Sequence, residues 1–556
     1  MGCAEEHASP LQTLLVLAAF LGVLSACWVI PLRLGFGAKA SFYKFGFIGD
    51  EYSYAERCQP LLSGATATNP INGVCDEDCL SQFYLEDAIR TLLAFTGLNV
   101  ISFFWLWRSV FPLLFFGVIG LLVWECLPAG GEGGTRRSRL WLAASAASFI
   151  SVYLVYDLLT VFPPLQGFVN RVPTNLEYLL SALIAWAFVR LIKKCDWRNG
   201  AALAAISAAA VYARPYAAVP WGIAIPLGIL ILLALGRFKV SVGIAMLATL
   251  AVLLSVWVAR YLHNRAVPVE AELWSRCFGQ PPYSFHERWP MFLSLAAVFA
   301  VAARLLGRHW LPLTASAAAT LAVLPFVSAL FPFGWQLLIA DRYGLYYLPL
   351  LPVAVLLALG SRLQGPGAGK WPACLAMIAL CGAAVIGIRN ARYDFAAYDC
   401  GPYGSIVQDL KCLPAYNWVR ENTPPGALFL VDDGCDWSGA GPRDPTRSMA
   451  RTESFRADLF LLAAQRRRVY HNTLYMFALS DSALGTLRTA HIGTFGASVR
   501  REDYVASLRA CRPDYVFWRK DCAVVPRGLG CELALRCDIV YQDQAVLIWK
   551  LPPEGL

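Results

Sequence analysis

A series of long apolar segments constrains this chain more than any other feature. A helix needs roughly 20 consecutive, mostly apolar residues to cross the hydrocarbon core of a bilayer. Eleven segments approach this requirement, near residues 11–32, 106–127, 141–160, 177–192, 200–213, 218–236, 240–260, 290–304, 311–330, 343–360 and 371–388. The pattern predicts an α-helical polytopic membrane protein with about 11 transmembrane helices.

Two parts of this assignment have alternatives. Residues 91–105 are also apolar and are either an interfacial helix or an additional span. Residues 200–236 are either two short spans around Arg214-Pro215 or one long kinked helix, because proline disrupts a helix interior. The first segment lies where a signal peptide would lie, but it is longer than a usual signal core and no basic residue precedes it. These features favour an uncleaved span.

The charged residues divide the chain into two parts. The whole chain of 556 residues is 57% hydrophobic and 15% charged, whereas soluble domains are roughly 45–50% apolar and about 25% charged. Residues 389–556 hold 21 Lys/Arg and 19 Asp/Glu, a density typical of a soluble domain. We therefore expect a transmembrane domain at 1–388, with a long first outer loop at 34–105, and an extracytoplasmic α/β domain at 389–556. The net charge of +9 lies mainly in the membrane domain and does not indicate nucleic-acid binding.

Short loops rich in Lys and Arg predict the orientation, since such loops stay in the cytoplasm. Alternate loops carry 13 basic residues: Arg136, Arg137, Arg139, Arg190, Lys193, Lys194, Arg198, Arg237, Lys239, Arg304, Arg308, Arg362 and Lys370. The N-terminus is then cytoplasmic. An odd number of spans places the C-terminal domain in the periplasm or outside the cell, as expected in a bacterial inner (plasma) membrane.

Cysteines are concentrated in the segments predicted to lie outside. Eleven of the 17 are there: Cys58, Cys75, Cys79, Cys277, Cys400, Cys412, Cys435, Cys511, Cys522, Cys531 and Cys537. Disulfides persist in oxidising compartments, so we expect disulfides in this part of the chain. The C-x3-C spacing of Cys75 and Cys79 favours a local disulfide over a metal site, because no histidine cluster accompanies it.

The C-terminal domain has the pattern of a small α/β fold. Apolar runs predict strands at 427–431, 468–471, 513–518 and 540–551, the last being a possible hairpin around Asp543. Helical patterns cover 405–420, 453–466 and 502–510. The basic cluster 466–468 is either a contact for anionic lipid or acceptor, or a solvated helix end, which is the commoner case.

Three sequence patterns resemble one enzyme superfamily. The first is Gly49-Asp50-Glu51-Tyr52-Ser53-Tyr54, an acidic pair soon after the first span. The second is Asp341-Arg342-Tyr343, followed by Tyr347-Leu348-Pro349 and Pro352. The third is Tyr416-Asn417-Trp418-Val419-Arg420-Glu421-Asn422-Thr423-Pro424-Pro425. Together they resemble the GT-C membrane glycosyltransferases, in particular the branch of aminoarabinose transferases and protein O-mannosyltransferases.

The resemblance implies transfer of a sugar from a polyprenyl-phosphate donor to an extracytoplasmic acceptor, which is a glycolipid, a glycan or a protein. Three acids are candidates for roles in such a transfer, Asp50 and Glu51 from the resemblance and Asp157 from its position. Asp50 is the candidate general base or acceptor-orienting group. Glu51 either orients Asp50, binds the acceptor or helps to hold a divalent cation (Mg²⁺ or Mn²⁺). Asp157, at the expected outer end of the third span, could share that metal or bind the acceptor. The plainer alternative for each is a solvated acid near the interface.

Arginine suits the donor phosphate, because its planar guanidinium matches phosphate oxygens. Four candidates stand at expected outer span ends: Arg342, which the resemblance favours, and Arg171, Arg214 and Arg57. The alternative is that they extend toward lipid headgroups. Four further residues are candidates for contact with donor or acceptor: Tyr54, Tyr343, His263 and His286.

Two other functional classes remain open from the sequence. A transporter or flippase of a lipid-linked glycan would show charges deep in the bundle and a repeated hydropathy pattern. A non-catalytic envelope assembly protein would depend on residues 389–556 and not on Asp50 or Glu51.

Overall fold

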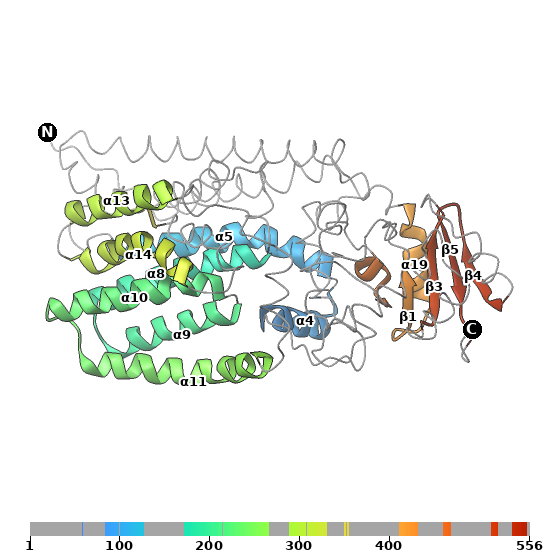
Figure 1. The fold of residues 1–556 in the computed structure, drawn as a ribbon, viewed down its shortest axis with the longest axis horizontal. Coiled ribbons are helices and arrows are strands. Elements are labelled where there is room, and N and C mark those ends of the chain that lie inside the picture. Colours follow the sequence, from blue (N-terminus) through green and yellow to red (C-terminus); the bar gives the residue numbers. More distant parts are fainter. Residues whose placement is uncertain are drawn as a thin grey trace, which may run out of the picture. The chain divides into compact units, whose positions relative to one another are not determined.

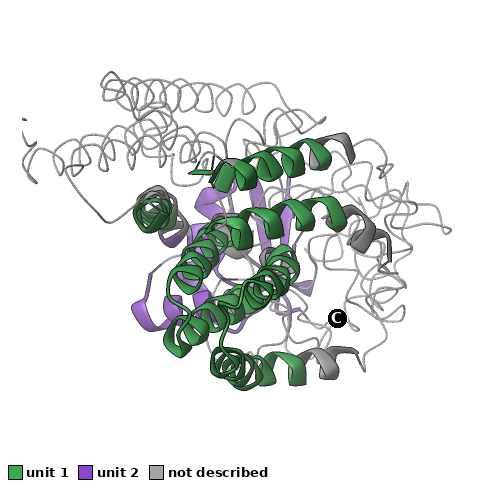
Figure 2. Cartoon of the chain, turned by 90° about the vertical axis from the view of Figure 1, so that its left-hand side faces the viewer, with its two compact units in different colours: residues 1–40, 105–262, 280–395 green, residues 41–104, 263–279, 396–556 purple. Residues whose placement is uncertain are grey.

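The structure is a computed structural model in which two compact units are distinguished (Figure 2). It describes residues 58, 84–98, 100–126, 172–213, 215–265, 289–306, 309–330, 350–351, 353–354, 411–431, 460–468, 513–520 and 536–552. Unit 1 comprises residues 1–40, 105–262 and 280–395, and unit 2 comprises residues 41–104, 263–279 and 396–556. The domain boundary predicted at 388/389 lies outside the described residues and stays a prediction.

Seven long helices lie wholly or mostly in unit 1 (Figure 1). They are α5 (Val100–Cys126), α8 (Val172–Lys193), α9 (Trp197–Ala213), α10 (Pro215–Ala234), α11 (Val240–Arg265), α13 (Trp289–Leu306) and α14 (Leu311–Leu330). Helix α10 packs against α8, α9 and α14, while α8 also packs against α9 and α13 against α14. These helices match seven of the predicted segments. Segments 11–32, 141–160 and 371–388 lie outside the described residues and 343–360 lies mostly outside them, so the number of eleven stays a prediction.

One described helix is both long and apolar enough to cross a membrane, by length and composition. This is the stretch Val240–Ala259 of α11, with a mean hydropathy of 2.4. Shorter apolar stretches in the described part of the chain are Gly117–Cys126, Pro220–Ala234, Leu293–Arg304 and Leu311–Val323.

The structure resolves both ambiguous segments. Residues 91–105 are not one span: α4 (Tyr84–Thr96) ends there and α5 begins at Val100. Gly97 ends α4 with a φ of +68° and donates its N–H to the Leu93 carbonyl at 2.9 Å, a helix stop that suits glycine. Residues 200–236 form the two separate helices α9 and α10. Pro215 is the first residue of α10, where its missing N–H does no harm.

Glycines permit the closest helix contacts in unit 1. A Cβ at Gly228 of α10 would overlap the Phe188 ring of α8 and lie 3.0 Å from the Pro312 carbonyl oxygen. A Cβ at Gly200 of α9 would lie 2.8 Å from Val242 of α11. These approaches bury large side chains nearby, and Phe188 is fully buried. Close packing of this kind stabilises helix contacts where lipid-facing surfaces gain nothing from the hydrophobic effect.

Unit 2 contains a five-stranded mixed sheet. Its strands are β1 (Leu428–Val431), β2 (Arg467–Arg468), β3 (Tyr515–Arg519), β4 (Asp538–Gln542) and β5 (Val546–Lys550), in the order β2-β1-β3-β5-β4. Strand β1 runs parallel to β2 and β3, whereas β5 runs antiparallel to β3 and β4. The predicted hairpin around Asp543 is confirmed. The Asp543 carboxylate accepts the N–H groups of Ala545 and Val546, each at 2.7 Å.

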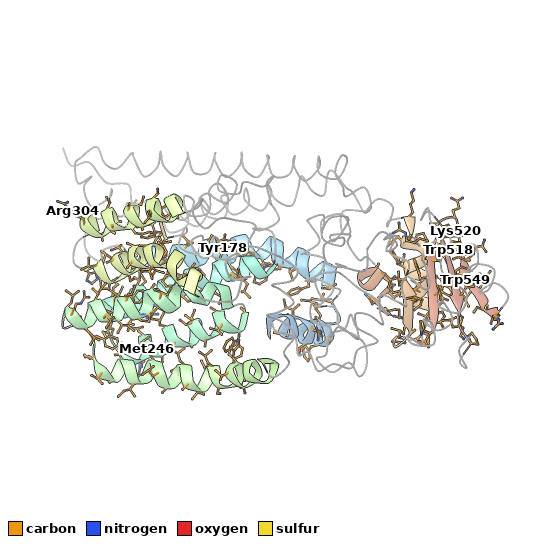
Figure 3. All side chains as sticks on the ribbon, in the orientation of Figure 1. Tyr178, Met246, Arg304, Trp518, Lys520 and Trp549 are labelled. Carbon is orange, nitrogen blue, oxygen red and sulfur yellow. The ribbon has the colours of Figure 1, made fainter. Side chains whose placement is uncertain are left out.

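Aromatic side chains hold helices against one face of this sheet. Tyr416 of α19 (Leu413–Asn422) stacks on Phe517 at 5.4 Å, and Phe460 of η3 (Phe460–Ala464) meets Phe517 at 5.3 Å. On the opposite face Trp518 and Trp549 stack with their ring centroids 5.5 Å apart (Figure 3). The α/β prediction for this region is therefore correct in kind.

The expected disulfides stay a prediction: of the eleven outer cysteines only Cys58, Cys412 and Cys537 are described, and the described residues contain no disulfide. Cys537 is a buried thiol whose pKa is raised to about 11 by that burial. One expectation for the C-terminal region needs correction. Arg466 is not a solvated helix end. It is 4% exposed and donates to the carbonyls of Arg420 and Thr423, at 2.6 and 2.7 Å.

Candidate functional site

Nearly all residues of the predicted site lie outside the described part of the chain. These are Asp50, Glu51, Tyr54, Arg57, Asp157, Arg171, Arg214, His286, Arg342 and Tyr343. His263 lies in the last turn of α11. The described residues instead show the two ends of the helices of unit 1. Several of the predicted site residues are neighbours in sequence of the residues at these helix ends.

Basic side chains gather at one end of unit 1, which we call the basic end. Lys193, the last residue of α8, donates to the Glu125 carbonyl oxygen at 2.6 Å and lies 3.3 Å from the Glu125 carboxylate. Arg190 lies 3.9 Å from the same carboxylate. Helices α5 and α8 therefore finish side by side.

Two further helix connections, α10–α11 and α13–α14, meet at the same end. Arg237, between α10 and α11, donates to the Ile192 carbonyl at 2.7 Å. Its guanidinium also lies 3.4 Å from Nδ1 of His309, between α13 and α14. Burial, followed by the positive charges of Arg237 and Lys193, lowers the pKa of His309. A neutral imidazole here leaves the positive charge to the Arg and Lys side chains.

The described basic residues of the expected cytoplasmic loops thus share one end of the unit. Arg304, at the end of α13, marks that end in Figure 3. This arrangement agrees with the alternation that the loop charges predicted, in which successive helices run in opposite directions.

The opposite end of unit 1 carries a buried polar cluster. Glu177, Tyr178 and Ser181, early in α8, are 2%, 1% and 1% exposed. The indole Nε1 of Trp221, early in α10, donates to the Ser181 hydroxyl at 2.8 Å. Helix α8 begins directly after Arg171 in the sequence, and the residues on either side of Arg214 end α9 and begin α10. This is therefore the end to which two of the four predicted phosphate ligands are joined.

Glu177 is a candidate that the sequence reasoning missed. An ionisable residue in a membrane-spanning segment is costly and is a functional hypothesis by default. Glu177 is the first residue of the predicted span 177–192, and no sequence pattern singled it out. The available signal was the helical pattern: Glu177 and Ser181 are four residues apart and so share a face of α8.

The chemistry of a metal site is not tested by the described residues. Among them no group of three or more His, Cys, Asp or Glu side chains could hold a metal ion. The three acids predicted to share a divalent cation lie elsewhere in the sequence, so that ligand set stays a prediction.

The fold is similar to that of a solved structure with a bound lipid phosphate. The crystal structure of ArnT from Cupriavidus metallidurans bound to undecaprenyl phosphate matches 96% of this chain and 97% of its own, with a TM-score of 0.53 and 11% identity. No protein family profile matches the sequence, and no curated protein sequence matches it. At this level of identity the structural likeness shows the fold alone, which is like that of ArnT over almost the whole chain.

Proposed function

We propose that this chain is an integral membrane glycosyltransferase that takes its sugar from a polyprenyl-phosphate donor. The observation that carries the proposal is the likeness of fold to ArnT, whose structure contains undecaprenyl phosphate, over almost the full length of both chains. The acceptor is an extracytoplasmic glycolipid, glycan or protein. Only 11% of the apolar stretch Val240–Ala259 of α11 is buried, and this exposed apolar surface supports a place in the bilayer.

The orientation that we propose places the basic end in the bacterial cytoplasm. The buried cluster around Glu177 then lies toward the outer face, where a lipid-linked donor would be met. Residues 389–556 lie in the periplasm or outside the cell. Positive charge in the short connections supports this direction.

In the proposed reaction, Asp50 takes the proton of the acceptor hydroxyl as its oxygen attacks the anomeric carbon. The bond between that carbon and the donor phosphate oxygen breaks, and polyprenyl phosphate leaves with the electron pair. A single displacement inverts the anomeric centre. Arg342 is the first candidate to stabilise the leaving phosphate, with Arg171, Arg214 and Arg57 as further candidates.

Supporting roles follow from the same chemistry. Glu51 and Asp157 either orient the acceptor or, with Asp50, hold Mg²⁺ or Mn²⁺, which would add positive charge near the phosphate. Tyr54, Tyr343, His263 and His286 are candidates for contact with the bound substrates. Glu177 is added to these candidates because a buried acid at this end of α8 is expensive to maintain without a function.

The decisive test is Asp50→Asn in the full-length protein. Loss of a general base removes typically 10²–10⁴-fold of rate, so sugar transfer should fall by that factor while expression and thermal stability stay normal. Mass spectrometry of envelope glycolipids and glycoproteins from a deletion strain, complemented with wild type or variant, measures the transfer. Arg342→Ala in the same assay should raise the apparent KM for the donor.

Glu125→Gln is the matched control, because Glu125 is a half-buried carboxylate at the basic end and should leave transfer unchanged. Transfer by Asp50→Asn within a few-fold of wild type would contradict the assigned role. Movement of the lipid-linked sugar across the membrane of vesicles that contain the protein but no acceptor would instead favour a flippase. A phenotype that depends on residues 389–556 but not on Asp50 or Glu51 would favour an assembly protein.

A further inference from the structure

Helix α11 presents an exposed apolar row. Val240, Ile244, Leu247 and Val258 lie on one side of the helix and are 44–74% exposed. The helix lies at one edge of the described helices of unit 1 (Figure 1). An exposed apolar surface of this length on a helix of spanning length is suited to lipid acyl chains.

Cations lie where this row begins. Lys239 immediately precedes α11 and is exposed, and Arg198 is exposed in the first turn of the neighbouring helix α9. The two helix starts are adjacent, because Gly200 of α9 closely approaches Val242 and Met246 of α11. The two helices also run in the same direction, since the Tyr212 hydroxyl near the end of α9 donates to the Leu253 carbonyl of α11.

One acidic side chain, Asp196, lies near these cations, and its pKa is lowered mainly by the Asn199 N–H and in smaller part by Lys194 and Arg198. Asp196 accepts the Asn199 N–H at 2.9 Å and pairs with Lys194 at 3.4 Å. Throughout the part of the chain that the structure describes, no carboxylate lies within ion-pair distance of Arg198 or Lys239. The start of the α9–α11 pair therefore carries positive charge beside an apolar surface.

An exposed aromatic side chain lies at the same end of α9 as Arg198. Trp197 is 59% exposed, and the guanidinium of Arg198 lies 5.5 Å from the centre of its ring. Tryptophan is enriched where the bilayer meets water, because its ring is apolar and its N–H is polar. The start of the α9–α11 pair thus combines cations, an indole and the beginning of the apolar row, which are the groups that suit the headgroup, the interface and the acyl chains of a phospholipid.

We propose that the starts of α9 and α11 form a binding site for an anionic phospholipid. Arg198 and Lys239 bind its headgroup phosphate, Trp197 lies at the glycerol level, and the acyl chains follow the exposed row of α11. The charge complementarity selects an anionic over a zwitterionic lipid. The apolar row selects a lipid over a soluble phosphate. This site lies at the basic end and does not depend on the proposed sugar transfer.

The test compares lipids retained by the full-length protein in native mass spectrometry, with phosphatidylglycerol and phosphatidylcholine as the probes. The double variant Arg198→Gln/Lys239→Gln removes both cations. Each basic residue near an anionic surface contributes about fivefold, so phosphatidylglycerol retention should weaken on the order of 25-fold. Phosphatidylcholine retention should not change, and high salt should weaken only phosphatidylglycerol binding.

Two controls make the result specific. Lys411→Gln/Lys550→Gln removes the same charge from exposed positions of unit 2 and should retain phosphatidylglycerol like wild type. Arg198→Lys/Lys239→Arg keeps both charges and should also retain it, which separates loss of charge from loss of folding. Equal retention of the two lipids by wild type, unchanged retention by the glutamine variant, or displacement of the lipid by inorganic phosphate would each overturn the proposal.

Discussion

At the scale of single residues, Arg466 shows that an arginine expected at a solvated surface can instead be buried and stabilise the fold. Three consecutive arginines in a sequence suggest a solvated or lipid-binding surface. In the structure Arg466 donates to the Arg420 and Thr423 carbonyls and, through Nε, to the Thr423 hydroxyl at 3.0 Å. Its guanidinium thus satisfies the carbonyl groups that the end of α19 leaves without helical partners. Burial and the nearby Arg420 lower its pKa, but a guanidinium stays charged.

We expect Arg466→Met to destabilise the end of α19. The substitution leaves buried carbonyls without donors, and each such group costs roughly 1–3 kcal/mol. Hydrogen exchange in the full-length protein should show faster exchange of the amides of α19 and β1 than in wild type. Lys411→Met, at an exposed position just before α19, is the control and should exchange normally. Normal exchange in Arg466→Met would show that water replaces the guanidinium at no cost.

The sequence offered site candidates from family patterns, as for Asp50 and Arg342, and from an expected position at an outer span end, as for Asp157 and Arg171. Neither signal singled out Glu177, which became a candidate only through its burial. Burial was hidden because α8 is apolar on most of its circumference, so no polar stripe shows which side meets its neighbours. The contact between Trp221 and Ser181 joins residues 40 positions apart, which no local pattern can indicate.

At the scale of elements, the sequence predicted which segments are helices better than how they pack. Apolar runs predicted α8 to α11, α13 and α14 with ends within a few residues, because length and hydropathy are local properties. Packing depends on positions where backbones approach, and those are small residues scattered along apolar helices. Helix α10 has two glycines, Gly222 and Gly228, that look equivalent in the sequence but differ in their surroundings.

Gly228→Ala should therefore destabilise unit 1, whereas Gly222→Ala should not. The new methyl group at 228 would overlap Phe188 and crowd the Pro312 carbonyl, and overpacking of this kind costs about 1–3 kcal/mol. A Cβ at Gly222 meets nothing within 4 Å. Thermal unfolding of the two variants in the same detergent measures the difference. A similar midpoint for both would show that α8 and α10 can separate without loss of stability.

At the scale of the whole molecule, most of the pairing of strands in the C-terminal sheet could not be predicted from the sequence, whereas the direction of the helices could. The sheet order combines parallel β1 and β3 with an antiparallel β5. Only the β4–β5 hairpin could be predicted locally, because its turn is stabilised by Asp543 within the same short segment. Pairing of β1 with β3 joins residues 429 and 515, a separation that local sequence patterns do not resolve. The direction of the helices relative to the membrane, by contrast, is predicted from loop charge alone and stays a prediction.

That direction predicts which parts of the molecule a protease reaches from each side. A protease site inserted after Gly236, in the exposed turn before α11, should be protected in intact spheroplasts and cleaved in inverted membrane vesicles. A site appended after residue 556 should show the opposite behaviour. An odd number of predicted spans lies between the two positions and places them on opposite sides of the membrane. Wild-type stability of each tagged protein is the control for insertion damage. Cleavage of both sites from the same side would mean that an even number of spans follows α10's cytoplasmic end, and the outward placement of the C-terminal domain would then be wrong.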